Sequence, residues 1–505
     1  MHVSNRRVGL AVAVVAGLLA VLVACGGGSV GTNGTGSPVL VGLNVGTVSG
    51  LGSVIVDGTR HDDSAAKTEI SRNGTDVEVG DVRLGHRVSL EFGTDAAGAQ
   101  VLQRIELLPS VSGRVSERTA DTIGVLGQTV TVNSDPGHGP VTAFDSPLNS
   151  LADLQLGDAV DVHALTQRTG AGPTDVRLVA TRITRRSALS GGVRVSGTVA
   201  ALSAAGSGGA RSFRLGALAV QLPSAAALLP QGIELLDGRA VTVFAAESAF
   251  DAATLSLGAG KVQVMSVGTA GSGGAASMLT RAGLVGAWTG TTFELDGVGL
   301  LVNADTQIVS AGQPLGDGAY VQATAVLNGS GRWLATRIAR LTASTASAEL
   351  RGTLDDWSAA ARTFRLRDTV VTLASTAQID LAACRASSLA NGLYVEVQGL
   401  STAQGLAAST VVCAPEPTGT KSRLERHGLV LTADATARKL TMRSQPGDPV
   451  LTVTWSDPLY LSEPLTVASL AALAGTSSEI EVEGTLSADG LQMAARKIKL
   501  RMPGP

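Results

Sequence analysis

The residues of this sequence that could do chemistry are few, and the densest group is His61-Asp62-Asp63. An imidazole beside two carboxylates could bind a divalent cation, although a polar turn after a strand has the same composition. Asp161 and His163 are two residues apart, which places both on one face of a strand, and there we expect a surface pair. The sequence contains no H-x-x-x-H or H-E-x-x-H pair, no calcium loop and no phosphate loop. We therefore expect no metal, no cofactor and no locally encoded catalytic group, while catalytic residues dispersed along the chain stay an alternative.

Cys25 is the cysteine whose surroundings predict the most specific chemistry. It ends Leu22-Val23-Ala24-Cys25, which follows Arg6-Arg7 and an apolar run over residues 8–21. This pattern resembles the lipobox of bacterial lipoproteins, in which the chain is cut before the cysteine and the thiol is acylated. The alternatives are a plain secretory signal and a transmembrane helix, but the run is short for a span and no charged stop follows it. Because Gly26 rather than Asp follows Cys25, the resemblance implies sorting to the outer membrane.

The other two cysteines, Cys384 and Cys413, are 29 residues apart. An exported protein meets an oxidising compartment, so we expect them to form a disulfide, with two separate buried thiols as the alternative. No histidine lies near either one in sequence, which disfavours a catalytic thiol. Residues 26–37 are rich in Gly, Ser, Thr and Asn and predict a flexible tether. The G-x-S-x-G at residues 27–31 lies inside that tether, without the strand and helix that a nucleophile elbow needs.

Composition limits the classes of fold and partner. Of the 505 residues, 44% are hydrophobic, 3% aromatic and 16% charged, and 62 are Gly, which suits short strands joined by tight turns. The net charge is −3, so the chain lacks the basic surface of a nucleic-acid-binding protein, and we expect no nucleic-acid partner. The four tryptophans, at positions 288, 333, 357 and 455, are scattered through the later part of the chain and are expected mostly in cores.

Turn glycines recur at near-even spacing, which predicts a repeat. We place one at each of positions 85, 157, 238, 316, 392 and 475, so that the intervals are 72, 81, 78, 76 and 83 residues. Opening strands of the form G-x-V begin at residues 46, 113 and 197, and alternating apolar segments close several units, although the third has no clear closing strand. Short Leu/Ala segments at 148–156, 225–229 and 467–474 are expected to form helical turns. Five strands and one short helix per unit resemble an OB-type barrel.

The first unit carries a more specific resemblance. Residues 46–58, GTVSGLGSVIVDG, followed by RHDDS at 60–64, resemble a family of bacterial β-repeat domains of unknown function that occur in tandem behind a lipobox. The resemblance covers roughly 42–108 and implies fold and location but no activity. We thus expect an all-β tandem array of about six OB-like barrels in a chain that contacts mainly sequence neighbours. The expected segments are 1–24 signal peptide, 25–40 lipidated cysteine and tether, and units at 41–109, 110–187, 188–267, 268–344, 345–414 and 415–505.

Function is therefore expected to be non-enzymatic. The leading hypothesis is a lipid-anchored scaffold or binding protein of the cell envelope, attached to the membrane through Cys25 and contacting an envelope protein or a glycan. The alternatives are a surface glycan-binding lipoprotein, which exposed tryptophans would favour, and an envelope enzyme with dispersed catalytic residues. The ligand, the side of the membrane and the assembly state do not follow from the sequence.

Overall fold

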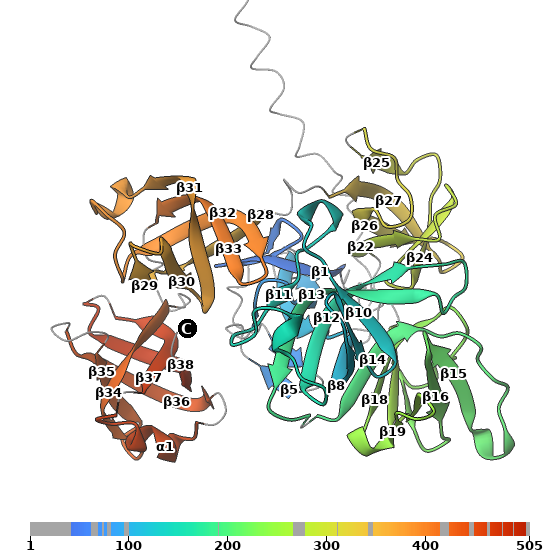
Figure 1. Cartoon of the computed structure of the whole chain (residues 1–505), viewed down its shortest axis with the longest axis horizontal. Coiled ribbons are helices and arrows are strands. Elements are labelled where there is room, and N and C mark those ends of the chain that lie inside the picture. Colours follow the sequence, from blue (N-terminus) through green and yellow to red (C-terminus); the bar gives the residue numbers. More distant parts are fainter. Residues whose placement is uncertain are drawn as a thin grey trace, which may run out of the picture. The chain divides into compact units, whose positions relative to one another are not determined.

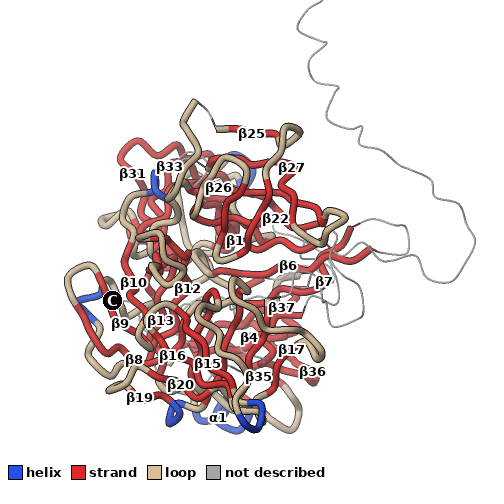
Figure 2. The backbone as a smooth tube through the Cα atoms, turned by 90° about the vertical axis from the view of Figure 1, so that its right-hand side faces the viewer, coloured by secondary structure: helices blue, strands red, loops and turns tan. Residues whose placement is uncertain are grey.

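A computed structural model describes residues 42–61, 69–72, 75–77, 82–94, 100–189, 191–265, 278–310, 312–341, 347–414, 424–443, 449–461, 465–476, 478–487 and 489–500. Strands make up most of these residues, and helices are few and short (Figure 2). Within the described part, no helix is both long and apolar enough to cross a membrane. All of the described residues belong to one unit, residues 39–505.

The last set of strands shows the repeated topology most simply (Figure 1). It closes into a barrel in the order β34 (Leu424–Asp434), β35 (Lys439–Arg443), β36 (Leu451–Leu461), β38 (Gln492–Leu500) and β37 (Glu479–Leu486). Every pairing is antiparallel except β36 with β38, and helix α1 (Val467–Ala472) connects the third strand to the fourth. A five-stranded barrel with this connectivity is OB-like, and closure leaves no strand edge exposed.

Five earlier sets of strands repeat this connectivity. The first contains β1 (Gly42–Leu51), β2 (Val54–Val56), β3 (Thr59–His61), β4 (Glu69–Arg72), β5 (Thr75–Val77), β6 (Arg87–Thr94) and β7 (Gln100–Leu107). The second contains β8 (Val111–Arg118), β9 (Thr122–Val125), β10 (Gln128–Val132), β11 (Ala143–Phe144), β12 (Ala159–Arg168) and β13 (Val176–Arg186). The third contains β14 (Val193–Thr198), β15 (Arg211–Leu215), β16 (Leu218–Leu222), β17 (Ala227–Leu229), β18 (Ala240–Ala245), β19 (Phe250–Asp251), β20 (Ser256–Gly258) and β21 (Lys261–Val264).

The fourth set contains β22 (Met278–Gly286), β23 (Thr292–Leu295), β24 (Val298–Leu301), β25 (Gln307–Val309), β26 (Tyr320–Leu327) and β27 (Trp333–Arg340). The fifth contains β28 (Ser347–Thr353), β29 (Asp355–Ser358), β30 (Thr363–Leu366), β31 (Thr369–Asp380), β32 (Tyr394–Thr402) and β33 (Gly405–Cys413). In all six sets the closing strand pairs in parallel with a strand from the middle of the set, as β13 does with β10. The predicted tandem array of small OB-like barrels is therefore confirmed.

Two details of the sequence reading are wrong. The third barrel does have a closing strand, split into β20 and β21, which pair in parallel with β16 and β17. Residues 227–229, expected in a helical turn, form β17 instead, because this segment supplies the partner that β21 needs. The other two expected helical segments contain the 3₁₀ turn Leu151–Asp153 and helix α1, each with a capping box at its start.

One backbone hydrogen bond explains why the turn glycine recurs. In every barrel its N–H donates to the carbonyl of the apolar residue two positions after the opening-strand glycine, over 2.8–3.2 Å. The six donors all have positive φ, which glycine adopts without steric cost; they are Gly85, Gly157, Gly238, Gly318, Gly392 and Gly475. In the fourth unit the equivalent residue is thus Gly318, not Gly316. The intervals become 72, 81, 80, 74 and 83 residues, and Gly283-Leu284-Val285 is that barrel's opening motif.

The opening-strand glycine has its own steric reason. A methyl group at Gly46 would overlap the carboxylate of Asp57, which lies in the tight turn after the second strand. The matching glycines Gly113 and Gly283 face Leu126 and Asp296 at the same place in their barrels. Each of these turn residues has a φ near +50°, so the hairpin folds back over strand one. The glycine of the G-x-V motif therefore lies where the hairpin turn packs against the opening strand.

The expectation that each unit contacts mainly its sequence neighbours is wrong. Strand β1 pairs in parallel with β22 of the fourth barrel and with β28 of the fifth. One hydrophobic core contains buried residues of both the first and the fifth barrels, such as Val88 and Val397. A second core is shared by the second and third barrels, whose strands β8 and β14 also pair. Apolar surface that a small barrel cannot cover alone is thus buried against sequence neighbours and also against barrels that are distant in sequence.

Candidate functional site

His61 lies beside uncharged side chains. Its Nε2 lies 3.1 Å from the side-chain amide nitrogen of Asn44, and its ring lies 5.2 Å from that of Phe92. Burial lowers the pKa of His61, which favours the uncharged imidazole. Asp62 and Asp63 lie outside the described residues, as do Cys25 and residues 26–37. Among the residues that are described, no three His, Cys, Asp or Glu side chains form a group that could hold a metal ion.

Asp161 and His163 do not form the expected surface pair. Both are buried, with Asp161 5% and His163 0% exposed, because strand β12 is covered on the face that carries them. The ring of His163 stacks on that of His86 from the first barrel at 4.5 Å, and the backbone N–H of Arg87 donates to its Nδ1 over 3.0 Å. These residues therefore join the first barrel to the second, and sequence periodicity alone does not reveal that contact.

Cys384 and Cys413 are joined in a disulfide, with their Cα atoms 5.8 Å apart. The bond connects the helical turn before β32 to the end of β33. The four tryptophans all pack against barrel cores: Trp333 and Trp455 are buried, and Trp288 and Trp357 are half-buried. None of the four offers an exposed stacking surface for a sugar.

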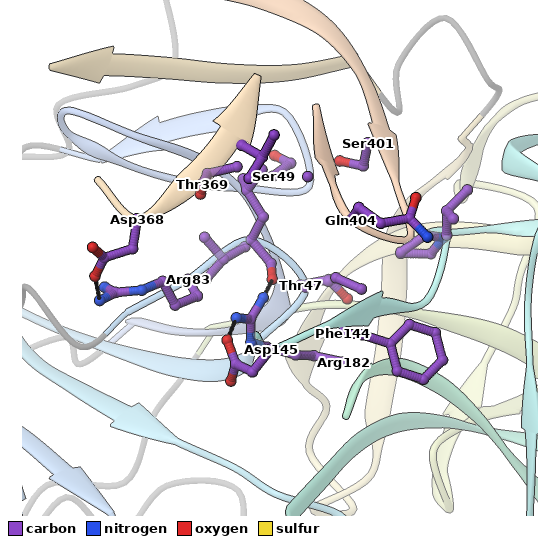
Figure 3. A pocket seen from close by; sticks show the side chains of 18 of the residues that line it. Thr47, Ser49, Arg83, Phe144, Asp145, Arg182, Asp368, Thr369, Ser401 and Gln404 are labelled. Carbon is purple, nitrogen blue, oxygen red and sulfur yellow. Dashed lines mark hydrogen bonds and ion pairs between the residues drawn. The ribbon is translucent and has the colours of Figure 1, made fainter. Parts of the chain in front are cut away.

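The main candidate site is a cavity of about 490 Å³. Its walls come from several barrels, chiefly from β1 and the turn before β6 in the first, the segment after β11 in the second, and β30 to β33 in the fifth (Figure 3). Side chains of opposite charge meet in its lining, together with hydroxyls, an amide and two aromatic rings. The residues of greatest chemical interest are Ser49, Asp57, Arg83, Phe144, Asp145, Arg182, Tyr320, Arg365, Asp368, Ser401, Gln404 and Lys499.

Ion pairs hold most of the charged lining in place. Arg83 donates to Asp368 over 2.7 Å, and Lys499 of the sixth barrel contacts the same carboxylate oxygen. These two cations hold the pKa of Asp368 well below its usual range, against the opposing effect of burial. On another wall Arg182 pairs with Asp145 and also donates to the carbonyl of Leu84 over 2.8 Å (Figure 3). Three of the four cations in the lining are thus held in ion pairs.

Asp57 behaves differently from the other carboxylates. The residue is half-buried, but its carboxylate is enclosed between the hydroxyl of Tyr320, which donates over 2.5 Å, and the backbone N–H of Thr47 at 3.1 Å. Burial raises the pKa of Asp57 to about 6, because desolvation of the charge outweighs the attraction of Arg87 and the two hydrogen bonds. The cavity therefore has one carboxyl group whose charge changes in mildly acidic solution.

Three further polar residues of the cavity lining lie on the fifth barrel. Arg365 is half-buried on β30, and its one hydrogen bond among the described contacts runs 3.3 Å to the backbone carbonyl of Asp368. Ser401 lies near the end of β32, and the exposed Gln404 lies in the turn before β33, where its Nε2 donates to the carbonyl of Asn149 over 3.2 Å (Figure 3). Sequence reasoning missed all three. The sequence does mark Asp57 and Asp368, because each lies in a tight hairpin turn, after β2 and after β30 respectively. That pattern is also typical of an ordinary hairpin.

Comparison with known proteins agrees with this architecture. Three segments, 112–184, 282–339 and 351–411, match a family described as Domain of unknown function (DUF5666). They fall on the second, fourth and fifth barrels, so the resemblance to tandem repeats of unknown function is confirmed. The first unit, where the sequence resemblance is sharpest, is not among these segments.

No curated protein matches the sequence at a significant level. Among solved structures the chain is similar to one of drosophila Unr CSD456, with 11% identity over 61% of this chain and 98% of that one. The TM-score of this pair is 0.11, and the similarity carries no argument about function.

Proposed function

We propose that this chain is a non-enzymatic, lipid-anchored binding protein of the cell envelope, and that the cavity between its barrels holds a small polar ligand. The cavity carries the proposal, since about 490 Å³ is a usual size for a small-molecule site. Most of its charged groups are paired with one another, which suits a fixed binding wall better than a poised acid, base or nucleophile. Arg365 favours a ligand with an acidic group, because a guanidinium pairs well with carboxylate or phosphate.

A glycan is the second candidate ligand. The hydroxyl and amide groups of Ser49, Ser401 and Gln404 offer the kind of hydrogen bonds that sugar hydroxyls make. Stacking on tryptophan, the other usual feature of a sugar site, would have to come from elsewhere, because the four tryptophans pack on barrel cores. Phe144 and Tyr320 are the aromatic rings in the cavity wall. An acidic sugar would satisfy both kinds of group.

Binding can be measured on the full chain with defined probes. We expect glucuronic acid or a short uronic-acid oligomer to bind saturably in calorimetry, and the neutral sugar of the same size to bind more weakly. Arg365→Gln should weaken binding about tenfold, since a charge-assisted hydrogen bond contributes roughly 1.5–3 kcal/mol. Arg332→Gln is the matched control, because Arg332 is exposed on the fourth barrel and does not line the cavity. Equal loss in both variants, or no binding by any acidic or neutral sugar, would contradict the proposed site.

The envelope location rests on the lipobox resemblance at residues 22–25 alone. We expect the mature protein to begin at Cys25 and to carry acyl mass there, which intact-mass spectrometry detects. Cys25→Ala should move the protein from the membrane fraction to the soluble fraction. Membrane association that persists in this variant, with no acyl mass on the parent protein, would rule out the lipid anchor.

A further inference from the structure

A second cavity lies where the first four barrels meet, and arginine dominates it. Its volume is about 50 Å³, enough for one small ion but not for an organic ligand. Four charged residues line it: Arg87 at the start of β6, Arg194 on β14, Arg281 on β22, and Asp296 in the turn after β23. The three arginines come from three different barrels, and each is 3–4% exposed.

One carboxylate serves two of these guanidinium groups. Asp296 accepts from Arg87 over 2.6 Å and from Arg281 over 3.3 Å, both at the same oxygen, while its other oxygen accepts from the backbone N–H of Thr166 at 2.9 Å. Arg87 makes further hydrogen bonds, because it also donates to the Thr47 hydroxyl and to the carbonyl of Ala282. Two buried guanidinium groups therefore contact the same carboxylate oxygen, while Asp57 is a second carboxylate that attracts Arg87.

Arg281 is only partly satisfied by its hydrogen bonds. Its 3.3 Å bond to Asp296 is long, and its buried Nε has no hydrogen-bond partner among the described residues. Burial lowers the pKa of Arg281, and the neighbouring charge of Arg87 acts in the same direction. A buried guanidinium without full compensation is costly, and an added negative charge would offset that cost.

The third barrel also contributes donors to the lining of the cavity. Arg194 lies over the ring of Phe244 at 5.3 Å, and it is attracted by Glu106 and Asp161, which lie beyond the cavity lining. Burial is nevertheless the largest influence and lowers the pKa of Arg194 to about 10. The hydroxyls of Ser196 and Thr242 lie 2.9 Å apart in the same wall, so either can turn its proton toward a bound ion.

We propose that this cavity binds one small inorganic anion, chloride or a tetrahedral oxyanion, between Arg281 on one wall and Arg194, Ser196 and Thr242 on the other. The anion would accept a hydrogen bond from the buried Nε of Arg281, which has no partner among the described residues. Because the walls belong to four barrels, binding holds those barrels together, and a ligand that binds only the docked form stabilises it. The site is separate from the larger cavity and does not depend on the proposed function.

Anion dependence of thermal unfolding tests the inference on the full chain. Sodium chloride, phosphate and sulfate are each titrated against gluconate at constant ionic strength, so that general screening stays fixed. We expect a saturable rise of the melting temperature by about 2 °C or more with one of these ions. Saturation with chloride identifies a halide site, and saturation with phosphate or sulfate identifies an oxyanion site. Equal, non-saturating responses to all three would overturn the proposal.

Matched variants and direct localisation complete the test. Arg281→Gln should abolish the saturable response, whereas Arg337→Gln, which changes an exposed arginine on β27 of the same barrel, should keep it. Thr242→Val removes a wall hydroxyl without removing charge and should weaken the saturable response. This variant tests the site if Arg281→Gln fails to fold. In crystals grown with bromide, or with phosphate when the titration favours an oxyanion, anomalous or difference density should lie between Arg281 and Arg194. Water alone at that position in both soaks would disprove the site.

Discussion

Replacement of Asp296 by Asn is expected to lower the free energy of unfolding by about 3–5 kcal/mol, the usual cost of removing one partner from a buried ion pair. Asn keeps the shape and can still accept the Thr166 N–H, so the loss comes from charge. Arg87 and Arg281 would then face each other, almost fully buried, without the carboxylate that both now contact. Urea denaturation at neutral pH and low salt, followed by circular dichroism, measures the change.

Asp305→Asn is the matched control for this experiment. Asp305 is exposed in the same barrel, and among the described residues its hydrogen bonds are to the nearby Asn303, so its replacement should change stability by less than about 0.5 kcal/mol. A loss for Asp296→Asn no larger than that of the control would show that the junction between barrels contributes little to folding. A separate early transition that contains only the fourth barrel would show instead that its docking is weak.

Much of each barrel is predictable from sequence because its determinants are local. The opening glycine, the turn glycine and the alternating closing strand lie within one unit of about 75 residues, and each has one dominant cause. Gly85, for example, has a positive φ and donates its N–H to the carbonyl of Val48. This local backbone conformation favours glycine at that position. The sequence pattern places the turn glycine of the fourth barrel two residues too early, at Gly316, because Gly316 and Gly318 lie in the same short loop. The N–H of Gly318 is the one that donates to the carbonyl of Val285.

Contacts between barrels are not predictable in the same way. Nothing near Val45 in sequence indicates that it pairs with Arg281, more than 200 residues later. The turn residues Asp57 and Asp296 look like ordinary D-G hairpin residues, yet each reaches across to another barrel, Asp57 to Tyr320 and Asp296 to Arg87. A turn must be polar whether it faces water or a buried partner, so its sequence cannot distinguish the two cases.

The hairpin turn after strand two is thus the docking element of this repeat. In the first and fourth barrels it inserts a carboxylate into the other barrel of the pair, which gives the two a reciprocal contact. In the fifth barrel the next residue of the same turn, Asp368, reaches Arg83 of the first barrel and Lys499 of the sixth. The cavities lie beside these turns, so binding and docking depend on the same residues. Several arginines, Arg83 and Arg87 among them, therefore form ion pairs at the junctions between barrels.

The disulfide is expected to stabilise the fifth barrel by about 3–4 kcal/mol, because it closes a loop of roughly 30 residues and so restricts the unfolded chain. The segment that it ties down, from Leu381 to the turn at Gly392, contains only one short helical turn and has little structure of its own. The fifth barrel shares its core with the first, so loss of the bond should weaken both.

The double variant Cys384→Ala/Cys413→Ala tests this expectation by denaturation beside the parent protein. Reductant should lower the stability of the parent to that of the variant and should leave the variant unchanged, which separates the bond from any packing effect of alanine. Thiol counting on denatured, unreduced protein should find neither cysteine free. If both thiols are free in material purified from the envelope, or if reductant has no effect on the parent, the fifth barrel must be held by its packing and strand pairing alone.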